Sequence, residues 1–165
     1  MTPWSQASTY KRWKKDVASH RLSKKNKRAN SSVDMCAEST FCKGNKAIGR
    51  SLMPQIYDVG EFRNEILKQY GVKSHMTRVL AANLKPSQDE IRKTSVDGIR
   101  KAVREGKYID NPIVIAKDNY IIDGHHRWAA LKAEGMKIKA LRINDTADNV
   151  LGMAAAIGSE REVFG

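Results

Sequence analysis

The fold of this chain is decided by the stretch Ile121-Ile122-Asp123-Gly124-His125-His126-Arg127-Trp128-Ala129-Ala130-Leu131. Consecutive isoleucines are typical of a buried strand, and the glycine that follows allows the backbone to turn closely. The composition after the glycine predicts a helix over residues 126–133. Backbone N–H groups at the start of a helix lack intrahelical acceptors, and the helix dipole favours an anion beside them. The stretch therefore predicts a strand–turn–helix unit that binds phosphate.

The polar residues of this turn suggest specific roles. Arg127 can hold a phosphate through a bidentate guanidinium fork, and Gly124 lets the backbone approach it. His125 and His126 can donate hydrogen bonds or move a proton near neutral pH. Adjacent side chains point in different directions, so we expect only one histidine to face the site. A purely structural turn, with both histidines bonded to backbone groups, is the alternative. Asp123 is a candidate catalytic carboxylate or metal ligand, or the group that orients a histidine.

Hydrophobic spacing on either side of the turn predicts an α+β domain. Residues 53–75 form a connecting amphipathic helix that starts near Pro54 and ends at Gly71. Residues 76–144 form the domain proper, and residues 145–165 form a C-terminal helix that Asp145 caps. The domain elements are expected, in chain order, as a strand from residue 76 to 82, a loop at 84–88, a helix at 94–106, strands at 113–116 and 120–122, the helix at 126–133 and a strand at 138–143.

Residues 1–52 are expected to form a basic helical extension. The first fifty residues hold twelve basic and three acidic side chains, whereas the whole chain has a net charge of +12. Such a surface attracts polyanions, and we expect it to bind the phosphates of DNA. The candidate nucleic-acid-binding residues are Lys11, Arg12, Lys14, Lys15, Lys24, Lys25, Lys27 and Arg28.

Apolar residues in this extension also fall at helical intervals. Trp4, Tyr10, Trp13 and Val17 are expected to pack as core rather than to stack on bases. A second helical stripe is expected at Ala29, Val33, Cys36 and Ala37.

The two cysteines, Cys36 and Cys42, are expected to be ordinary buried thiols. A structural zinc site needs four ligands, and a disulfide is uncommon in an intracellular protein. The chain has no apolar run long enough to span a membrane and no apolar core of a secretory signal at its start. A cytoplasmic protein, without membrane contact, is therefore expected.

The turn resembles the signature loop of the ParB/sulfiredoxin superfamily. ParB proteins carry Gly-Glu-Arg-Arg at this place and sulfiredoxins carry Gly-Cys-His-Arg. Free serine kinases and phage ParB-like nucleases carry the form Asp-Gly-His-His-Arg that is found here. The resemblance covers residues 76–144, including Leu84-Lys85-Pro86-Ser87-Gln88-Asp89-Glu90 and the Pro112-Ile113 strand entry. It implies the compact ParB/sulfiredoxin-like fold, which hosts several chemistries.

The resemblance also implies which residues face the phosphate. In this fold, the polar loop after the first strand lies across the nucleotide from the phosphate loop, so Ser87 and Gln88 are candidate phosphate ligands. Glu90 is a candidate general base or, with Asp123, a candidate ligand of Mg²⁺ or Mn²⁺. The alternative for Glu90 is a carboxylate that caps the next helix.

Departures from the family narrow its implications. The catalytic cysteine of sulfiredoxins would fall at His125, so reductase chemistry is not expected. Only residues 145–165 follow the domain, so the helix-turn-helix region of partitioning ParB proteins is not expected either.

Three functions remain as hypotheses. The first is a phage-encoded ParB-like nuclease or DNA-associated nucleotide-binding protein. The second is a small-molecule kinase that uses ATP or ADP, like the free serine kinases. The third is a non-catalytic module that binds a nucleotide such as ATP, ADP or CTP. The basic extension favours the first hypothesis, because a serine kinase has no need of a polyanion surface. The oligomeric state has no signature in the sequence.

Overall fold

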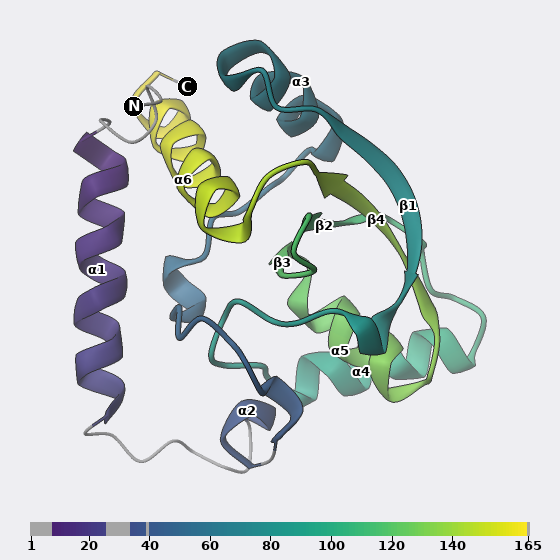
Figure 1. Cartoon of the computed structure of the whole chain (residues 1–165). Coiled ribbons are helices and arrows are strands. Elements are labelled where there is room, and N and C mark those ends of the chain that lie inside the picture. Colours follow the sequence, from purple (N-terminus) through teal and green to yellow (C-terminus); the bar gives the residue numbers. More distant parts are fainter. Residues whose placement is uncertain (1–7, 26–33, 39, 165) are drawn as a thin grey trace.

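A computed structural model describes residues 8–25, 34–38 and 40–164 as a three-layer α+β structure (Figure 1). A four-stranded sheet lies in the middle, with strand order β1-β4-β2-β3. The strands are β1 (Ser74–Leu80), β2 (Ile113–Ala116), β3 (Ile121–Asp123) and β4 (Lys137–Ile143). The main helices are α1 (Ser8–Lys25), α3 (Val59–Tyr70), α4 (Lys93–Arg104), α5 (His125–Ala133) and α6 (Ala147–Phe164). Shorter helical turns are α2 (Met35–Glu38), η2 (Thr40–Cys42), η3 (Arg50–Leu52) and η4 (Ala81–Asn83).

The sheet is mixed. Strand β4 pairs antiparallel with β1 and parallel with β2, and β2 pairs antiparallel with β3. Because side chains alternate across a strand, β2 serves two cores. Val114 and Ala116 face the core beneath α6 and α3, whereas Ile113 and Ile115 face the core beneath α4 and α5. Trp128 of α5 is fully buried in the second core, and its Nε1 donates to the carbonyl oxygen of Ala81 at 2.8 Å.

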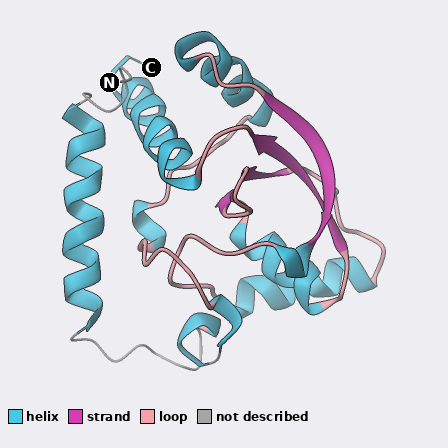
Figure 2. Cartoon of the chain, in the orientation of Figure 1, coloured by secondary structure: helices cyan, strands magenta, loops and turns pink. Residues whose placement is uncertain are grey.

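The α+β class and the order of the domain elements are confirmed. Figure 2 shows loops between η3 and α3, and between η4 and α4. Helix α3 starts at Val59 rather than near Pro54, because Asp58 provides its N-cap by accepting the N–H of Glu61. Gly71 ends it in the left-handed conformation, with a φ of 69°.

The N-terminal segment is docked on the domain through α1. Val17 is buried in the core beneath α6, Trp13 packs against that core, and the indole N–H of Trp13 donates to the carbonyl oxygen of Leu52. Core packing of Trp13 and Val17 is thus confirmed, whereas Trp4 lies outside the described residues. Of the predicted second stripe, Cys36 and Ala37 lie in the single turn α2, whereas Ala29 and Val33 lie outside the described residues.

The prediction of two free thiols is wrong. Cys36 and Cys42 form a disulfide, with their Cα atoms 4.9 Å apart. The spacing of six residues offered no geometric reason to expect a pair. In the structure, α2 and η2 bring the two backbones together.

None of the helices in the described ranges is long and apolar enough to cross a membrane.

Candidate functional site

The turn between β3 and α5 requires a glycine. Gly124 has a φ of 105°, and a Cβ atom there would lie only 2.3 Å from Cγ2 of Ile113. The first intrahelical hydrogen bond of α5 runs from the N–H of Trp128 to the carbonyl oxygen of Gly124. The N-cap residue is Gly124, which has no side chain that could accept a hydrogen bond from the first turn. The first turn of α5 is therefore an electropositive end, as the sequence predicted.

His125 points into the protein rather than toward a ligand. Its side chain is 4% exposed, and Nε2 accepts the backbone N–H groups of Ser87 at 3.0 Å and Gln88 at 3.3 Å. Because two donors converge on Nε2, the ring proton resides on Nδ1. Burial, and then the neighbouring His126, lower the pKa of His125 to about 3. His125 is therefore neutral at physiological pH and joins the turn at residues 123–127 to the polar loop.

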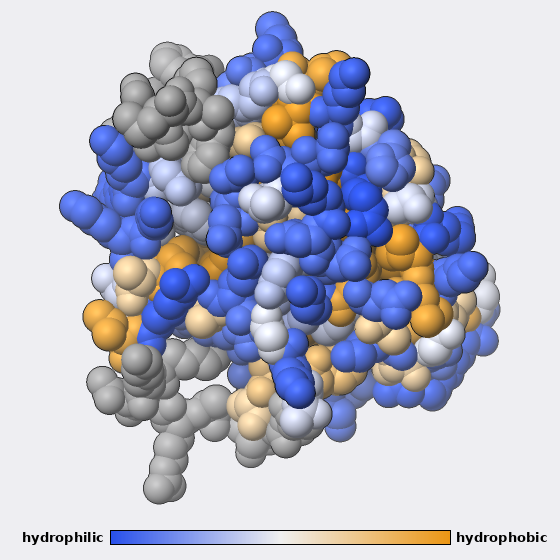
Figure 3. All heavy atoms as spheres, viewed as in Figure 1, coloured by the Kyte–Doolittle hydropathy of each residue, from blue (hydrophilic) through white to orange (hydrophobic). Residues whose placement is uncertain are grey.

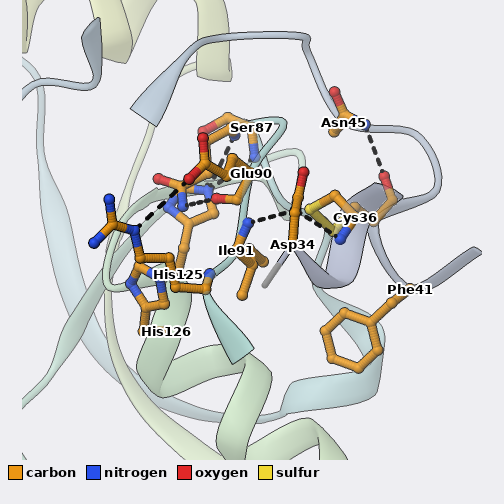
Figure 4. The surroundings of a disulfide bond; sticks show 12 residues. Asp34, Cys36, Phe41, Asn45, Ser87, Glu90, Ile91, His125 and His126 are labelled. Carbon is orange, nitrogen blue, oxygen red and sulfur yellow. Dashed lines mark hydrogen bonds and ion pairs between the residues drawn. A yellow bond between two sulfur atoms is a disulfide. The ribbon is translucent and has the colours of Figure 1, made fainter. Parts of the chain in front are cut away.

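The hydrogen bonds to His125 occupy the backbone N–H groups of Ser87 and Gln88, the two residues of the polar loop that were predicted to bind phosphate. The hydroxyl of Ser87 donates to the carbonyl oxygen of Ile121 at 2.5 Å and lies 3.2 Å from Nε2 of His125. The side-chain amide of Gln88 donates to the carbonyl oxygen of Glu90 at 2.6 Å. The structure thus brings three predicted site residues together, with Ser87 and Gln88 buried and hydrogen-bonded to their neighbours. Figure 4 shows Ser87 and His125 of this group.

His126 lies at the surface side of the same turn. It is half-buried, and its Nε2 accepts the backbone N–H of Arg92 at 3.1 Å. Its pKa is lowered by burial and then by the positive charges of Arg50 and Arg92. Neither arginine was among the predicted site residues. The dense basic composition near residue 50 was visible in the sequence, but its proximity to His126 was not.

The predicted carboxylates occupy different surroundings. Oδ2 of Asp123 accepts the backbone N–H of Ile56 at 3.3 Å, and burial raises the pKa of Asp123 despite this bond and the charge of Arg127. Glu90 lies 3.8 Å from Nε of Arg92. Glu90 is not the N-cap residue of α4, because that position is Arg92, whose own side chain makes no capping hydrogen bond.

A metal site is not completed by the described residues. Among them, no three His, Cys, Asp or Glu side chains gather as a group that could hold a metal ion. The predicted pair Glu90 and Asp123 therefore has no third protein ligand of these kinds. In nucleotide-binding proteins, Mg²⁺ is commonly held by one or two carboxylates together with phosphate oxygens of the substrate.

Arg127 is engaged with the backbone. Its Nη1 donates to the carbonyl oxygen of Asn111 at 2.9 Å and approaches that of Pro112 at 3.4 Å. The guanidinium thereby ties the first turn of α5 to the entry of β2. Both bonds come from Nη1, so they leave the N–H groups of Nη2 and Nε of Arg127 unused.

The N-terminal segment is hydrogen-bonded to the polar loop. The N–H of Lys46 donates to the carbonyl oxygen of Ser87, and the N–H of Asp89 donates to that of Ile48 at 2.9 Å. From α1, Nε2 of His20 lies 2.8 Å from Oδ2 of Asp89. Residues 46–50 thus support the segment that holds His125.

A second support comes from the disulfide segment. Oδ1 of Asp34 accepts the N–H groups of Cys36 at 2.9 Å and Ile91 at 3.1 Å. The N–H of Met35 donates to the carbonyl oxygen of Ile91. Figure 4 shows the resulting row of side chains, from Cys36 through Asp34 and Ile91 toward His126.

Helix α1 presents an exposed basic face. Its inner side carries Val17 and the half-buried Tyr10, Trp13 and His20, and the other side chains described between residues 11 and 22 are exposed. Figure 3 shows hydrophilic atoms projecting on the side of the molecule where α1 lies. Four of the predicted nucleic-acid-binding residues are exposed there: Lys11, Arg12, Lys14 and Lys15. Lys24 and Lys25 belong to the last turn of α1, and Lys27 and Arg28 lie outside the described residues.

A cavity of about 620 Å³ lies elsewhere, between α1, residues 51–58 and α6. Its lining includes Trp13, Phe62 and Ala155 but no residue of the turn at 123–127.

Comparison with known proteins gives a limited likeness. No family model matches the chain, and no curated protein matches it. Two solved structures of the pNOB8-like ParB N-domain, one of them its C2221 form, match with a TM-score of 0.38 and 23% identity. Each match covers 47% of this chain, and the chain spans about a third of their length, 33% and 30%. The function has to be sought in the residues of this chain itself.

Proposed function

We propose that this chain is a DNA-associated protein that binds a phosphate-bearing ligand at the first turn of α5. The observation that carries the proposal is the uncapped start of α5, formed at a turn that only glycine fits. Such a helix start offers backbone N–H groups and a positive dipole end to an anion. The resemblance of the Asp123–Arg127 turn to the ParB/sulfiredoxin loop agrees with this role.

The DNA-binding part of the proposal rests on α1. Its exposed lysines and arginine are carried on a helix that Val17 and Trp13 dock to the domain, so their spacing is fixed. A fixed row of cations can neutralise successive phosphates and release counterions. Deletion of the extension is a poor test, because residues 46–50 also support the polar loop. Substitution of solvent-facing residues is the better one.

The residues that we propose for catalysis are His126, Asp123 and Glu90. His126 is the histidine nearer the surface, and Asp123 has a raised pKa, which suits a carboxylate that accepts a proton. Glu90 is the further carboxylate beside Arg92. His125 holds the polar loop through its neutral ring. In a nuclease these groups would act on a phosphodiester, with Mg²⁺ or Mn²⁺ neutralising the charge that develops.

A nucleotide-dependent phosphotransferase is the second candidate. The observation that favours it is Asp123, a half-buried carboxyl group beside the α5 start whose raised pKa would let it serve as base toward a substrate hydroxyl. The third candidate, a module that binds ATP, ADP or CTP without reaction, requires only the uncapped helix start.

One set of assays separates the three. Wild type, His126→Gln and Asp123→Asn are incubated with supercoiled plasmid in Mg²⁺ or Mn²⁺, and separately with ATP and serine. The glutamine keeps an acceptor for the N–H of Arg92 but removes the imidazole. Nicking by the wild type alone supports the nuclease, and phosphoserine formation supports the kinase. DNA or nucleotide binding without either reaction supports the non-catalytic module. A wild type that binds neither phosphate ligand nor DNA contradicts the proposal.

A further inference from the structure

The cavity of about 620 Å³ lies where α1 and α6 run side by side (Figure 1), with the segment at residues 51–58 as its third wall. Protein interiors hold few voids larger than a water molecule, whereas pockets of about 300–1,000 Å³ hold small organic ligands. Small residues of α6 leave this space open. Ala154 and Ala155 line it, and no atom of the described residues lies within 4 Å of a Cβ atom built on Gly158.

The described lining of the cavity is largely apolar and partly aromatic. Trp13, Phe62 and Tyr57 supply three aromatic rings. The ring of Trp13 is held in place, because its indole N–H donates to the carbonyl oxygen of Leu52. Tyr57 is 84% exposed, so a ligand in the cavity would cover an aromatic side chain that the folded chain leaves in water. Aromatic side chains bury a large apolar area and prefer to pack against other rings.

The charge of the lining differs in sign from that of the whole chain. The chain has a net charge of +12, but the described lining contains no lysine or arginine and one carboxylate, Asp58. Oδ1 of Asp58 accepts the N–H of Glu61 at 3.0 Å, and within the described ranges no basic side chain pairs with this carboxylate. A cation is attracted both to a carboxylate and to the faces of Trp and Tyr rings. A phosphate would find no cation among these residues.

We propose that this cavity binds an aromatic molecule that carries a positive charge, with its ring against Trp13 and Phe62 and its cationic group toward Asp58. The inference goes beyond the proposed phosphate-binding function and does not depend on it, because the lining contains no residue of the turn at 123–127. It also explains the small residues of α6. Larger side chains at these positions would fill the space that the ligand occupies.

The test uses the full chain and compares tryptamine with indole-acetate, which share a ring and differ in the sign of their charge. Binding is followed by two-dimensional NMR of the isotope-labelled protein. Tryptamine should shift the backbone amide signals of Ile56 and Ala155, which line the cavity. Indole-acetate should bind about 10-fold more weakly, because it replaces attraction to Asp58 by repulsion.

Two variants test the site. Gly158→Leu places a side chain in the open space, and leucine has a higher helix propensity than glycine, so the fold should persist. Its binding of tryptamine should fall at least about 10-fold, because the leucine occupies the place of the ligand. Asp58→Asn keeps an acceptor for the N–H of Glu61 but removes the charge, and should weaken tryptamine binding about 3- to 5-fold.

The matched control is Asp97→Asn, which removes an exposed carboxylate from α4 on the other face of the sheet and should bind tryptamine like the wild type. Absence of shifts at Ile56 and Ala155 with millimolar tryptamine would overturn the inference. Unchanged binding by a folded Gly158→Leu variant would overturn it as well. Equal binding of the two probes, with no effect of Asp58→Asn, would overturn the selection of a cation. None of these results bears on the phosphate site, which the plasmid and ATP assays test separately.

Discussion

Nε2 of His125 accepts the backbone N–H of Ser87 at 3.0 Å, so the most conspicuous histidine of the sequence motif is a buried, neutral acceptor. Thirty-eight positions separate the two residues. The bond fastens the loop that follows β1 to the first residue of α5. Because the ring is buried and neutral, His125 makes the stability of the folded protein depend on pH.

Acid should unfold the protein through His125. Its pKa is about 3 in the folded protein, against about 6.5 in an unfolded chain, so the unfolded state binds the extra proton between these values. The stabilisation is fully present above pH 6.5 and is lost as the pH falls toward 3. We expect urea unfolding to show a loss of about 2 kcal/mol from this residue between pH 6.5 and 5.

The matched variant is His125→Gln, which keeps an acceptor but does not titrate. His126, with its lowered pKa, acts in the same direction as His125, whereas Asp123, with its raised pKa, acts in the opposite direction. The difference between wild type and variant therefore isolates His125. Equal slopes of stability against pH in the two proteins would show that His125 is not buried in a neutral form.

Gly124→Ala should be strongly destabilising. The new Cβ would meet Ile113 at 2.3 Å, and the backbone has a φ of 105° that alanine rarely adopts. Strain and overpacking together predict a loss of about 3 kcal/mol or more in the free energy of unfolding. The control is Gly135→Ala, where φ is 68° but nothing lies within 4 Å, and a loss of about 1 kcal/mol is expected. Comparable losses in the two variants would contradict the steric account.

The local pattern around Gly124 allowed the fold class to be predicted. The buried strands at 113–116 and 121–123, and the helix that ends near Ala133, follow from short-range hydrophobic spacing and from one glycine. Contacts between distant segments could not be predicted in this way. The bridge between Ile48 and Gln88 and the disulfide at Cys36 depend on how the N-terminal segment wraps the domain. The short-range spacing of apolar residues carries no information about how the N-terminal segment wraps the domain.

The same distinction applies to the site. Ser87, Gln88 and His125 are brought together as the family resemblance implied, but they bond to one another. A residue pattern identifies which groups meet and not which of their donors remain open. Arg50 and Arg92 were missed because they belong to no motif, and only their proximity to His126 distinguishes them from the other basic residues.

Loss of the disulfide should loosen the support of the polar loop. Closing a loop between cysteines six residues apart stabilises the folded state by about 2 kcal/mol in the chain-entropy model. We expect reduction by dithiothreitol, or the double substitution Cys36→Ser and Cys42→Ser, to lower the free energy of unfolding by this amount. The measurement is urea unfolding of oxidised and reduced protein, and dithiothreitol should leave the double variant unchanged.

Amide exchange provides the local check on this prediction. The N–H of Ile91 bonds to Asp34, which also accepts the N–H of Cys36, so its hydrogen exchange should accelerate on reduction. Unchanged exchange at Ile91 together with an unchanged urea midpoint would show that the disulfide does not support this segment.

Removing the solvent-facing charges of α1 should weaken DNA binding in a salt-dependent way. Lys11, Lys14 and Lys15 are exposed, so a triple alanine variant should keep its fold. Each phosphate that the protein no longer neutralises lowers the slope of log affinity against log salt by about 0.9, so the slope should fall by up to about 3. Fluorescence anisotropy of a labelled duplex between about 50 and 200 mM salt measures it. Lys137→Ala, which removes an exposed charge away from α1, should leave the slope as it is. If the triple variant kept the wild-type slope, the DNA-binding surface would have to lie on another face of the protein.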